Sequence, residues 1–234
     1  MKSYIIHLIR HGLTQSNIEG RLAGHTDSPL TEEGRAALYE LAPKYEKIHP
    51  VAVFSSPLSR SVETARILFP QHNPVVMDGF KEYYFGAWEN RRVEEVVDVS
   101  EEVQWDAFLN GSMKIPEAES PKQFLTRITA AFDGVIQGMM KSGVTETAIV
   151  THGGVIMTLM SLYAYPKAES PLDWNVDNGY GFTLRTNTAL WTRDQVLEAI
   201  ALLPPADETE DDGDYEDEDI AQYILDEEEE ISEE

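Results

Sequence analysis

Residues 8–17 read LIRHGLTQSN, and this stretch places Arg10 and His11 directly after an apolar run. The run itself, YIIHLI at 4–9, is rich in β-branched residues and does not alternate strictly with polar ones. Such a run is typical of a strand that is covered on both faces of a sheet. The sequence therefore predicts a buried strand whose carboxyl end carries two basic side chains.

Strand and helix patterns alternate along the rest of the chain. VAVF at 51–54 and TAIV at 147–150 read as two further buried strands. Helices are predicted after the N-cap Thr31 with a kink or break at Pro43, after the N-cap Ser56 with Pro57 first, over roughly 121–140, and over about 154–163. This alternation indicates a three-layer α/β/α sandwich with a mainly parallel sheet.

Length and composition limit the class of protein. With 234 residues and 42% hydrophobic content, the chain can form one main domain. There is no apolar run of about 18 residues and no room for a signal peptide before the first strand, so we expect a soluble, cytoplasmic protein without a membrane partner. Cysteine is absent, which excludes disulfides, thiolate metal sites and cysteine nucleophiles.

The net charge of −24 is concentrated at the C-terminus. Residues 206–234 contain 17 acidic residues and no lysine or arginine, which leaves 25 acidic against 18 basic residues in the body at 1–205. We expect this tail to be disordered and to act as a solubilising segment. The alternatives are a docking segment for a protein partner, or an anionic mimic that competes for the body's own ligand site. Neither part has a basic excess, which argues against nucleic acid as a partner.

Basic side chains follow three of the predicted strands. Arg10 and His11 follow the first, Arg60 lies just past VAVF, and His152 follows TAIV. Because ligands bind beyond the carboxyl ends of parallel strands, we expect these residues to converge. Arginine forks suit phosphoryl oxygens, histidine can act as a nucleophile or proton donor, and helix N-termini near Arg60 and at HGG, 152–154, add amide donors. The set predicts a phosphate monoester site.

Five blocks in order resemble the histidine phosphatase superfamily, the phosphoglycerate mutase-like proteins. They cover most of residues 5–156. The blocks are LIRHGLTQSN (8–17), GRLAGHTDSPLTEEG (20–34), SSPLSRSVETA (55–65), EYYFGAWENR (82–91) and VTHGGVI (150–156). A lone RHG string occurs by chance, whereas five ordered blocks are a strong signal.

The resemblance assigns a role to each basic residue and adds a carboxylate. His11 is implied as the nucleophile that becomes phosphohistidine, and Arg10, Arg60 and His152 as the groups that bind the phosphoryl oxygens. Glu82 is implied as the acid/base, which requires a raised pKa beside the phosphate. A neutral imidazole at His11 is needed, and the adjacent arginines disfavour its protonation.

Substrate-binding positions are also implied at Asn17, Gly24 and Gly153. The other four histidines are given structural roles: His7, His25, His49 and His72. No histidine pair has the HExxH spacing and the body has no acidic cluster of the magnesium type, so we expect neither metal nor cofactor.

At two positions the sequence differs from the pattern of the mutases in this superfamily, which favours a resemblance to its phosphatases. RHGLTQSN replaces the mutase-like RHGESEWN, and Tyr83 stands where mutases carry an arginine after the catalytic glutamate. The block EYYFGAWENR is similar to those of broad-specificity and α-ribazole phosphatases. The function predicted is a metal-independent phosphomonoester hydrolase. The alternatives are a phosphoglycerate mutase-type phosphotransferase, or a partner-binding protein on a phosphatase fold.

The predicted domain at 1–205 includes a cap over the site at about 86–120. This cap carries Trp88, Trp105 and Phe108, whose aromatic rings either contact a planar or apolar leaving group or pack within a small helical lid. The identity of the leaving group stays open from the sequence.

Deletion of residues 206–234 tests whether the tail competes for the anion site. We predict a lower apparent KM for anionic phosphomonoesters at low salt, because the tail's charge of −17 no longer opposes substrate binding, and a difference that shrinks as salt screens the charges. Steady-state kinetics of the full and shortened chains at two ionic strengths measure this. Equal KM values at low salt would contradict it.

Overall fold

The computed structural model describes residues 2–96 and 114–206. The cap residues Trp105 and Phe108 and the acidic segment after Ala206 lie outside these ranges, so their predicted structure stays a prediction. Among the described residues, no helix is long and apolar enough to cross a membrane.

A seven-stranded sheet forms the centre of the described structure, with the order β3-β2-β4-β1-β6-β7-β5. Four of its six strand pairings are parallel, while β6 runs antiparallel to both β1 and β7. The strands are β1 (Ser3–Arg10), β2 (Ala52–Ser55), β3 (Val75–Val76), β4 (Glu146–Thr151), β5 (Ala164–Tyr165), β6 (Gly181–Asn187) and β7 (Leu197–Leu203). The predicted mainly parallel sheet is confirmed.

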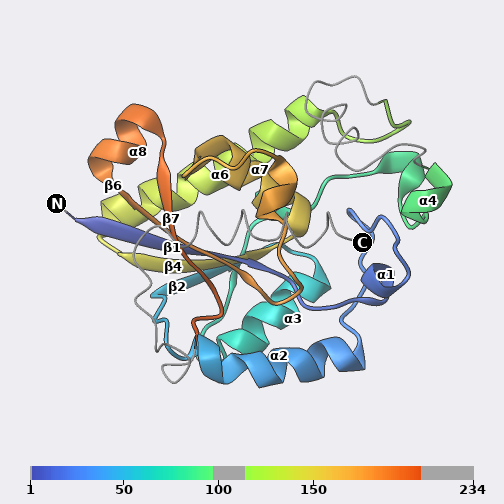
Figure 1. The fold of residues 1–234 in the computed structure, drawn as a ribbon, viewed down its shortest axis with the longest axis horizontal. Coiled ribbons are helices and arrows are strands. Elements are labelled where there is room, and N and C mark those ends of the chain that lie inside the picture. Colours follow the sequence, from blue (N-terminus) through green and yellow to red (C-terminus); the bar gives the residue numbers. More distant parts are fainter. Residues whose placement is uncertain (1, 97–113, 207–234) are drawn as a thin grey trace, which may run out of the picture.

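Helices cover both faces of this sheet (Figure 1). In that view α2 and α3 lie below the sheet, and α6, α7 and α8 lie above it. The helices are α1 (Gln15–Ile18), α2 (Glu32–Tyr45), α3 (Ser59–Leu68), α4 (Val93–Val96), α6 (Pro121–Ser142), α7 (Gly153–Tyr163) and α8 (Thr188–Asp194). Short 3₁₀ turns occur at η1 (Asp78–Phe80), η2 (Gly86–Trp88) and η3 (Pro171–Trp174). The three layers predicted from the alternating patterns are present.

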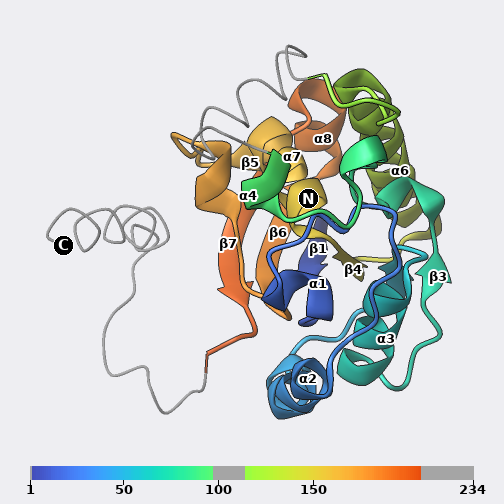
Figure 2. The same ribbon diagram turned by 90° about the vertical axis from the view of Figure 1, so that its right-hand side faces the viewer.

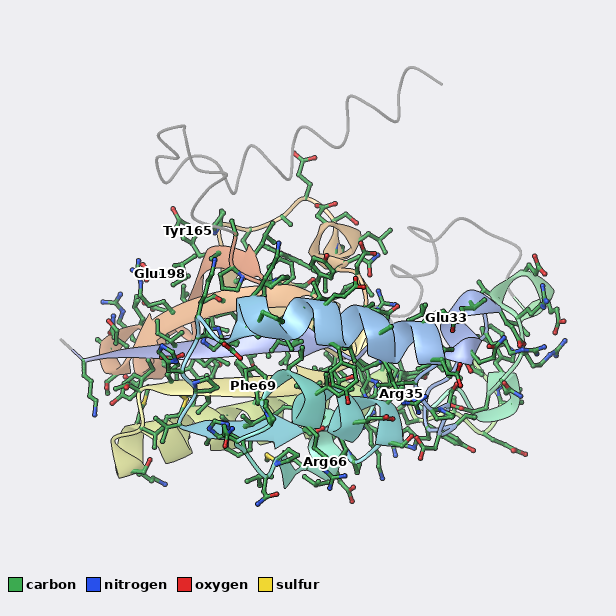
Figure 3. The ribbon with its side chains drawn as sticks, turned by 90° about the horizontal axis from the view of Figure 1, so that it is seen from below. Glu33, Arg35, Arg66, Phe69, Tyr165 and Glu198 are labelled. Atoms are coloured by element: carbon green, nitrogen blue, oxygen red, sulfur yellow. The ribbon has the colours of Figure 1, made fainter. Side chains whose placement is uncertain are left out.

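β1 is buried on both faces because it separates two hydrophobic clusters. Ile6 and Leu8 pack into the cluster under α6 and α7, and Ile9 packs into the one beside α2 and α3. On the α2 side of the sheet, Arg35 donates to Glu63 at 2.5 Å and ties α2 to α3. Figure 3 shows these two helices covering this face of the sheet, with Arg35 on α2 and Arg66 on α3. The unpatterned apolar run at 4–9 is explained by this two-sided burial.

Two helix boundaries differ from those predicted. Pro43 lies inside α2, which continues to Tyr45, so the helix does not break there: a proline in the last turn removes only one hydrogen bond near the helix end. Ser56 is not the N-cap of α3: Leu58 occupies that position without a side-chain cap. Asp27 Oδ1 instead accepts from the backbone N–H of Ser59 at 2.9 Å. That substitute cap comes from a distant loop, which local sequence cannot reveal.

An aromatic cluster joins the three helices above the sheet. Phe132 of α6 is fully buried, with its ring stacked on Tyr163 of α7 at 6.0 Å and edge-on to Trp191 of α8 at 5.7 Å. Trp191 Nε1 donates to Asp133 Oδ1 at 2.9 Å. Large buried rings dominate core energetics, so this cluster fixes α6 over the sheet.

Truncation of the central ring tests this packing. We predict that Phe132→Ala lowers the free energy of unfolding by about 3–5 kcal/mol, because it removes buried apolar surface and leaves a cavity. Urea denaturation measures the loss. Tyr39→Ala, at a ring that is 63% exposed on α2, is the control and should change stability by less than about 0.5 kcal/mol. A Phe132→Ala loss as small as the control's would refute the assignment.

Candidate active site

The predicted basic residues meet at the carboxyl ends of β1 and β4. These parallel strands pair Arg10 with Thr151, so that the next residues, His11 and His152, are neighbours. Their ring centroids are 5.2 Å apart, with the rings edge to face. Figure 2 looks onto this end of the sheet, with α1 and α4 in front. The register of two strands thus brings together residues 141 positions apart in the chain.

His11 is buried in a defined tautomer. Its Nδ1 lies 2.7 Å from the carbonyl oxygen of Gly12, which can only accept, so Nδ1 carries the proton and Nε2 has the lone pair. The backbone on both sides is also fixed. Thr64 Oγ1 accepts from Gly12 N at 2.9 Å, and Asn178 Nδ2 donates to the His11 carbonyl at 2.9 Å. The arrangement leaves Nε2 as the unprotonated ring nitrogen, which is the form that a nucleophilic role requires.

Arg10, the residue before His11, has one buried side-chain donor that no protein group accepts. Its Nη1 donates to the carbonyl of Val176 at 2.5 Å, whereas its Nε is buried without a hydrogen-bond partner. That Nε lies 3.5 Å from the point where a Cβ on Gly153 would stand, beside the first turn of α7. An unpartnered buried cationic donor is costly unless a ligand receives it, and a phosphoryl oxygen is suited to that role.

Arg60 is more deeply buried, at 1% exposure, and most of its donors are used within the protein. Nη1 donates to the Thr26 carbonyl at 2.9 Å, and Nη2 donates to those of Ala23 at 2.8 Å and Gly24 at 2.9 Å. Its Nε donates to His152 Nδ1 at 3.3 Å. Arg60 therefore supports the 23–26 loop and supplies positive charge, with one of its five N–H groups left for a substrate.

His152 is held between two protein groups. Because Arg60 donates to Nδ1, the proton lies on Nε2, which donates to Ser56 Oγ at 2.8 Å. The resemblance implied that His152 binds phosphoryl oxygens. In this structure both of its ring nitrogens have protein partners, so a direct contact with phosphate needs an exchange of the Ser56 bond.

Glu82 reaches the first turn of α7. Its Oε1 accepts from its neighbour Tyr83 N at 2.8 Å, and its Oε2 accepts from Gly154 N at 2.9 Å. A side chain at Gly154 would place its Cβ 2.5 Å from Oε1, so glycine leaves the space that the carboxylate fills. The α7 N-terminus, expected to bind the substrate anion, has one amide committed to this carboxylate.

Burial and charge set the protonation of these groups. The pKa of His11 lies well below 6.5, first because the ring is buried and then because Arg60 and Arg10 oppose a positive charge. Burial and Arg60 likewise hold the pKa of His152 well below 6.5. Burial raises the pKa of Glu82, although its amide bonds and the nearby Arg60 and Arg127 act in the opposite direction. Two neutral imidazoles thus lie beside a carboxyl that can be protonated.

The three weaker substrate-binding predictions have different positions. Gly24 lies at the site, where its carbonyl accepts from Arg60 and a Cβ would fall 1.9 Å from the Tyr83 carbonyl oxygen. Gly153 begins α7 beside Arg10. Asn17 is used locally: its Oδ1 accepts from Thr14 N at 3.1 Å in the capping box of α1. Its predicted role stays untested.

Several supporting residues were missed from the sequence. Glu89 accepts from the backbone N–H groups of His25 at 3.0 Å and Thr26 at 2.9 Å, which joins the 23–26 loop to the segment after Glu82. Its place in the quoted block EYYFGAWENR was an available signal. Other supporting residues that were missed are Thr64, Asn178, Glu119 and Arg127. A charged residue at 127 could have been noticed, because it lies on the face of α6 that buries Phe124 and Ile128.

Of the histidines predicted to have structural roles, His7 and His25 have clear surroundings, and His25 lies near the site. His7 is buried in β1, where it lies 3.0 Å from Thr183 Oγ1 and 3.2 Å from Glu146 Oε1. His25, next to Gly24, has its ring 5.0 Å from that of Tyr84. Within residues 2–96 and 114–206, no three histidine or acidic side chains are grouped as metal ligands.

Comparison with known families identifies the class of protein. Residues 6–194 match the model of the histidine phosphatase superfamily (branch 1). The chain therefore belongs to this superfamily and is an enzyme of the histidine phosphatase class, as the five sequence blocks predicted.

The similar proteins include both phosphoglycerate mutases and a phosphatase. The chain is 31% identical over 169 residues to the probable phosphoglycerate mutase GpmB of Enterobacter sp. (strain 638), covering 68% of this chain and 76% of that protein. The α-ribazole phosphatase structure from Shigella flexneri has a TM-score of 0.68 and 25% identity, over 85% of this chain and 95% of that one. The structure of a phosphoglycerate mutase from Bacillus anthracis str. Sterne has a TM-score of 0.67 and 22% identity, over 85% of this chain and 92% of that one, and it shows the shared fold.

Burial of neutral His11 predicts a pH-dependent stability. The folded-state pKa is below the ordinary 6.5, so on acidification the unfolded chain takes up the proton first, and stability falls as the pH drops below 6.5. We predict that the free energy of unfolding of His11→Gln falls less steeply with decreasing pH than that of wild type, by up to about 1.4 kcal/mol per pH unit. Urea denaturation between pH 7.5 and 5.5 measures it, with the exposed His49→Gln as control. Identical pH slopes for wild type and His11→Gln would contradict the prediction.

Proposed function

We propose that this protein is a phosphomonoester hydrolase that works through a phosphohistidine on His11, with Glu82 as acid and base. One observation carries the proposal. The Nδ1 proton of His11 is held by the Gly12 carbonyl, so the Nε2 lone pair is available in a buried site that contains two arginines and the Glu82 carboxyl. A neutral nucleophile, fixed cations and a protonatable carboxyl are the groups that phosphoryl transfer to histidine requires.

In the first step, Nε2 of His11 attacks phosphorus and the bond from phosphorus to the leaving oxygen breaks. That oxygen takes the proton of Glu82, so an alcohol leaves instead of an alkoxide. Arg10, through its unpartnered Nε, and the charge of Arg60 stabilise the negative charge on the phosphoryl oxygens in the transition state.

In the second step, the Glu82 carboxylate accepts a proton from water as the water oxygen attacks phosphorus. The bond between phosphorus and Nε2 breaks, its electron pair returns to His11, and inorganic phosphate leaves. Glu82 ends the cycle protonated and His11 neutral, as both began. The raised pKa of Glu82 suits a group that must exchange a proton in both directions.

The surroundings of Glu82 favour hydrolysis over mutase activity. Tyr83, at the position where mutases carry an arginine, is buried and its hydroxyl donates to the carbonyl of Glu119. The nearby Arg91 and Arg92 pair with Glu95 at 3.6 Å and Glu94 at 3.2 Å. Tyr83 is thus committed within the protein and brings no positive charge to the site, which does not favour recognition of a doubly anionic sugar acid.

The domain organisation proposed with this function is a catalytic body at 1–205, a cap at about 86–120 and an acidic tail at 206–234. Of the cap, the structure describes 86–96 and 114–120. Trp88 ends the η2 turn in this region. The cap is where we expect the organic part of the substrate to be recognised.

Phosphate release tests the function. In EDTA, the wild type should release inorganic phosphate from at least some members of a panel of alkyl, sugar and aryl phosphomonoesters, and His11→Ala should lose this activity by about 10³-fold or more, because the nucleophile is absent. His49→Ala, at an exposed histidine, is the matched control and should retain activity. Alkaline quenching followed by mass spectrometry should detect phosphohistidine at residue 11.

The alternatives give other results. Transfer of the phosphoryl group to a second alcohol without phosphate release would indicate a mutase. Absence of turnover with every ester, together with tail-dependent capture of a protein, would indicate a partner-binding protein. Release that survives in His11→Ala would exclude the proposed mechanism.

A further inference from the structure

Arg127 of α6 is bound to the segment that carries Glu82. Its Nη1 donates to the carbonyls of Gly79 at 3.1 Å and Lys81 at 2.6 Å, and its Nη2 donates to the carbonyl of Glu82 itself at 2.7 Å. The remaining bonds go to Glu119, from Nε at 2.9 Å and from Nη2 at 2.5 Å. These bonds account for all five N–H donors of a guanidinium.

Glu119 completes the attachment on the other side of Glu82. Its Oε1 accepts from the backbone N–H of Tyr84 at 2.8 Å, and its carbonyl accepts from the hydroxyl of Tyr83. The pair is shielded, with 23% of the Arg127 side chain and 12% of the Glu119 side chain exposed. Residues 79–84 are therefore fixed from both sides of Glu82, by Arg127 of α6 and by Glu119, which lies just before that helix.

The same pair contributes to the charge around Glu82. The groups that face this carboxyl come from four elements: Arg10 from β1, Arg60 from α3, Arg127 from α6, and the Gly154 amide from α7. His11 and His152 are held neutral by burial. Arg127 adds positive charge near Glu82, and Glu119, in direct contact with Arg127, offsets part of it.

We propose that the Arg127–Glu119 ion pair is the positioning device of the acid/base: it fixes the 79–84 segment and sets the pH range over which Glu82 gives up its proton. The proposal rests on the proposed function, since it assigns a role within the same site. Neither residue touches the reacting atoms; both act through Glu82.

The test removes the positive charge of Arg127 in one variant and the negative charge of Glu119 in another. The measurement is the pH profile of kcat/KM for an alkyl phosphate, whose leaving group needs a proton. The fall in kcat/KM at alkaline pH should report loss of the Glu82 proton. If Glu82→Gln removes this alkaline limb, the limb is assigned to Glu82. Arg127→Gln should move the limb to higher pH, because a stabilising positive charge is lost. Glu119→Gln should move it to lower pH, because the charge of Arg127 is no longer offset. Each shift should be on the order of 0.5–1 pH unit.

A purely structural role predicts another pattern, since both variants break the same ion pair. Shifts in the same direction, or no shift in either folded variant, would overturn the proposal. Arg185→Gln, which breaks the exposed Arg185–Glu198 pair between β6 and β7, is the control and should leave the profile unchanged.

A third variant separates geometry from charge and serves if a glutamine variant fails to fold. Arg127→Lys keeps the charge but loses the fork that binds three carbonyls and Glu119 at once. We expect its alkaline limb to stay near the wild-type position while kcat for the alkyl ester falls by about tenfold or more with a smaller change in KM. Full kcat in Arg127→Lys would overturn the positioning role.

The wild type distinguishes this proposal from the function it rests on. If wild type forms phosphohistidine and shows the Glu82-dependent limb, the hydrolase mechanism stands whatever the variants do. If wild type shows neither, the proposed function has failed, and the role of the ion pair fails with it.

Discussion

The buried guanidinium of Arg60 is the interaction on which the geometry of the site depends. It is 1% exposed and donates to His152 and to the carbonyls of Ala23, Gly24 and Thr26. Burying a cation is costly unless most of its donors find acceptors, so α3, the 23–26 loop and the end of β4 must assemble together. Glu89 then links the same loop to the segment after Glu82, because it accepts from the amides of His25, Thr26 and Phe85.

One electrostatic arrangement produces two different protonation states. Burial disfavours charge on every group in the site, which keeps His11 neutral and favours the protonated form of Glu82. The arginines strengthen the first effect and weaken the second, because a positive charge opposes an imidazolium and stabilises a carboxylate. A neutral imidazole at residue 11 and a carboxyl with a raised pKa at residue 82 can therefore lie in one small buried site.

Much of the fold was predictable from local pattern. The unbroken apolar runs indicated strands buried on both faces, and the Thr31 cap, the amphipathic stretch at 121–140 and the HGG turn indicated helices, which the structure contains. The antiparallel strands β6 and β7 were not identified, nor was the cap that Asp27 supplies to α3. Those features depend on partners distant in the sequence, and short-range periodicity does not specify such partners.

The sequence by itself determined the family, the layered fold and the residue types at the strand ends. The family followed from the resemblance of five ordered blocks, and the layers followed from the alternating strand and helix patterns. The convergence of the basic residues was predictable because ligands bind beyond the carboxyl ends of parallel strands. Only the tertiary structure decided which nitrogen of His11 is free, that both nitrogens of His152 have protein partners, and that Arg127 holds Glu82. The reason is physical: hydrogen bonds and burial depend on distances between packed elements, which exist only once the chain has folded.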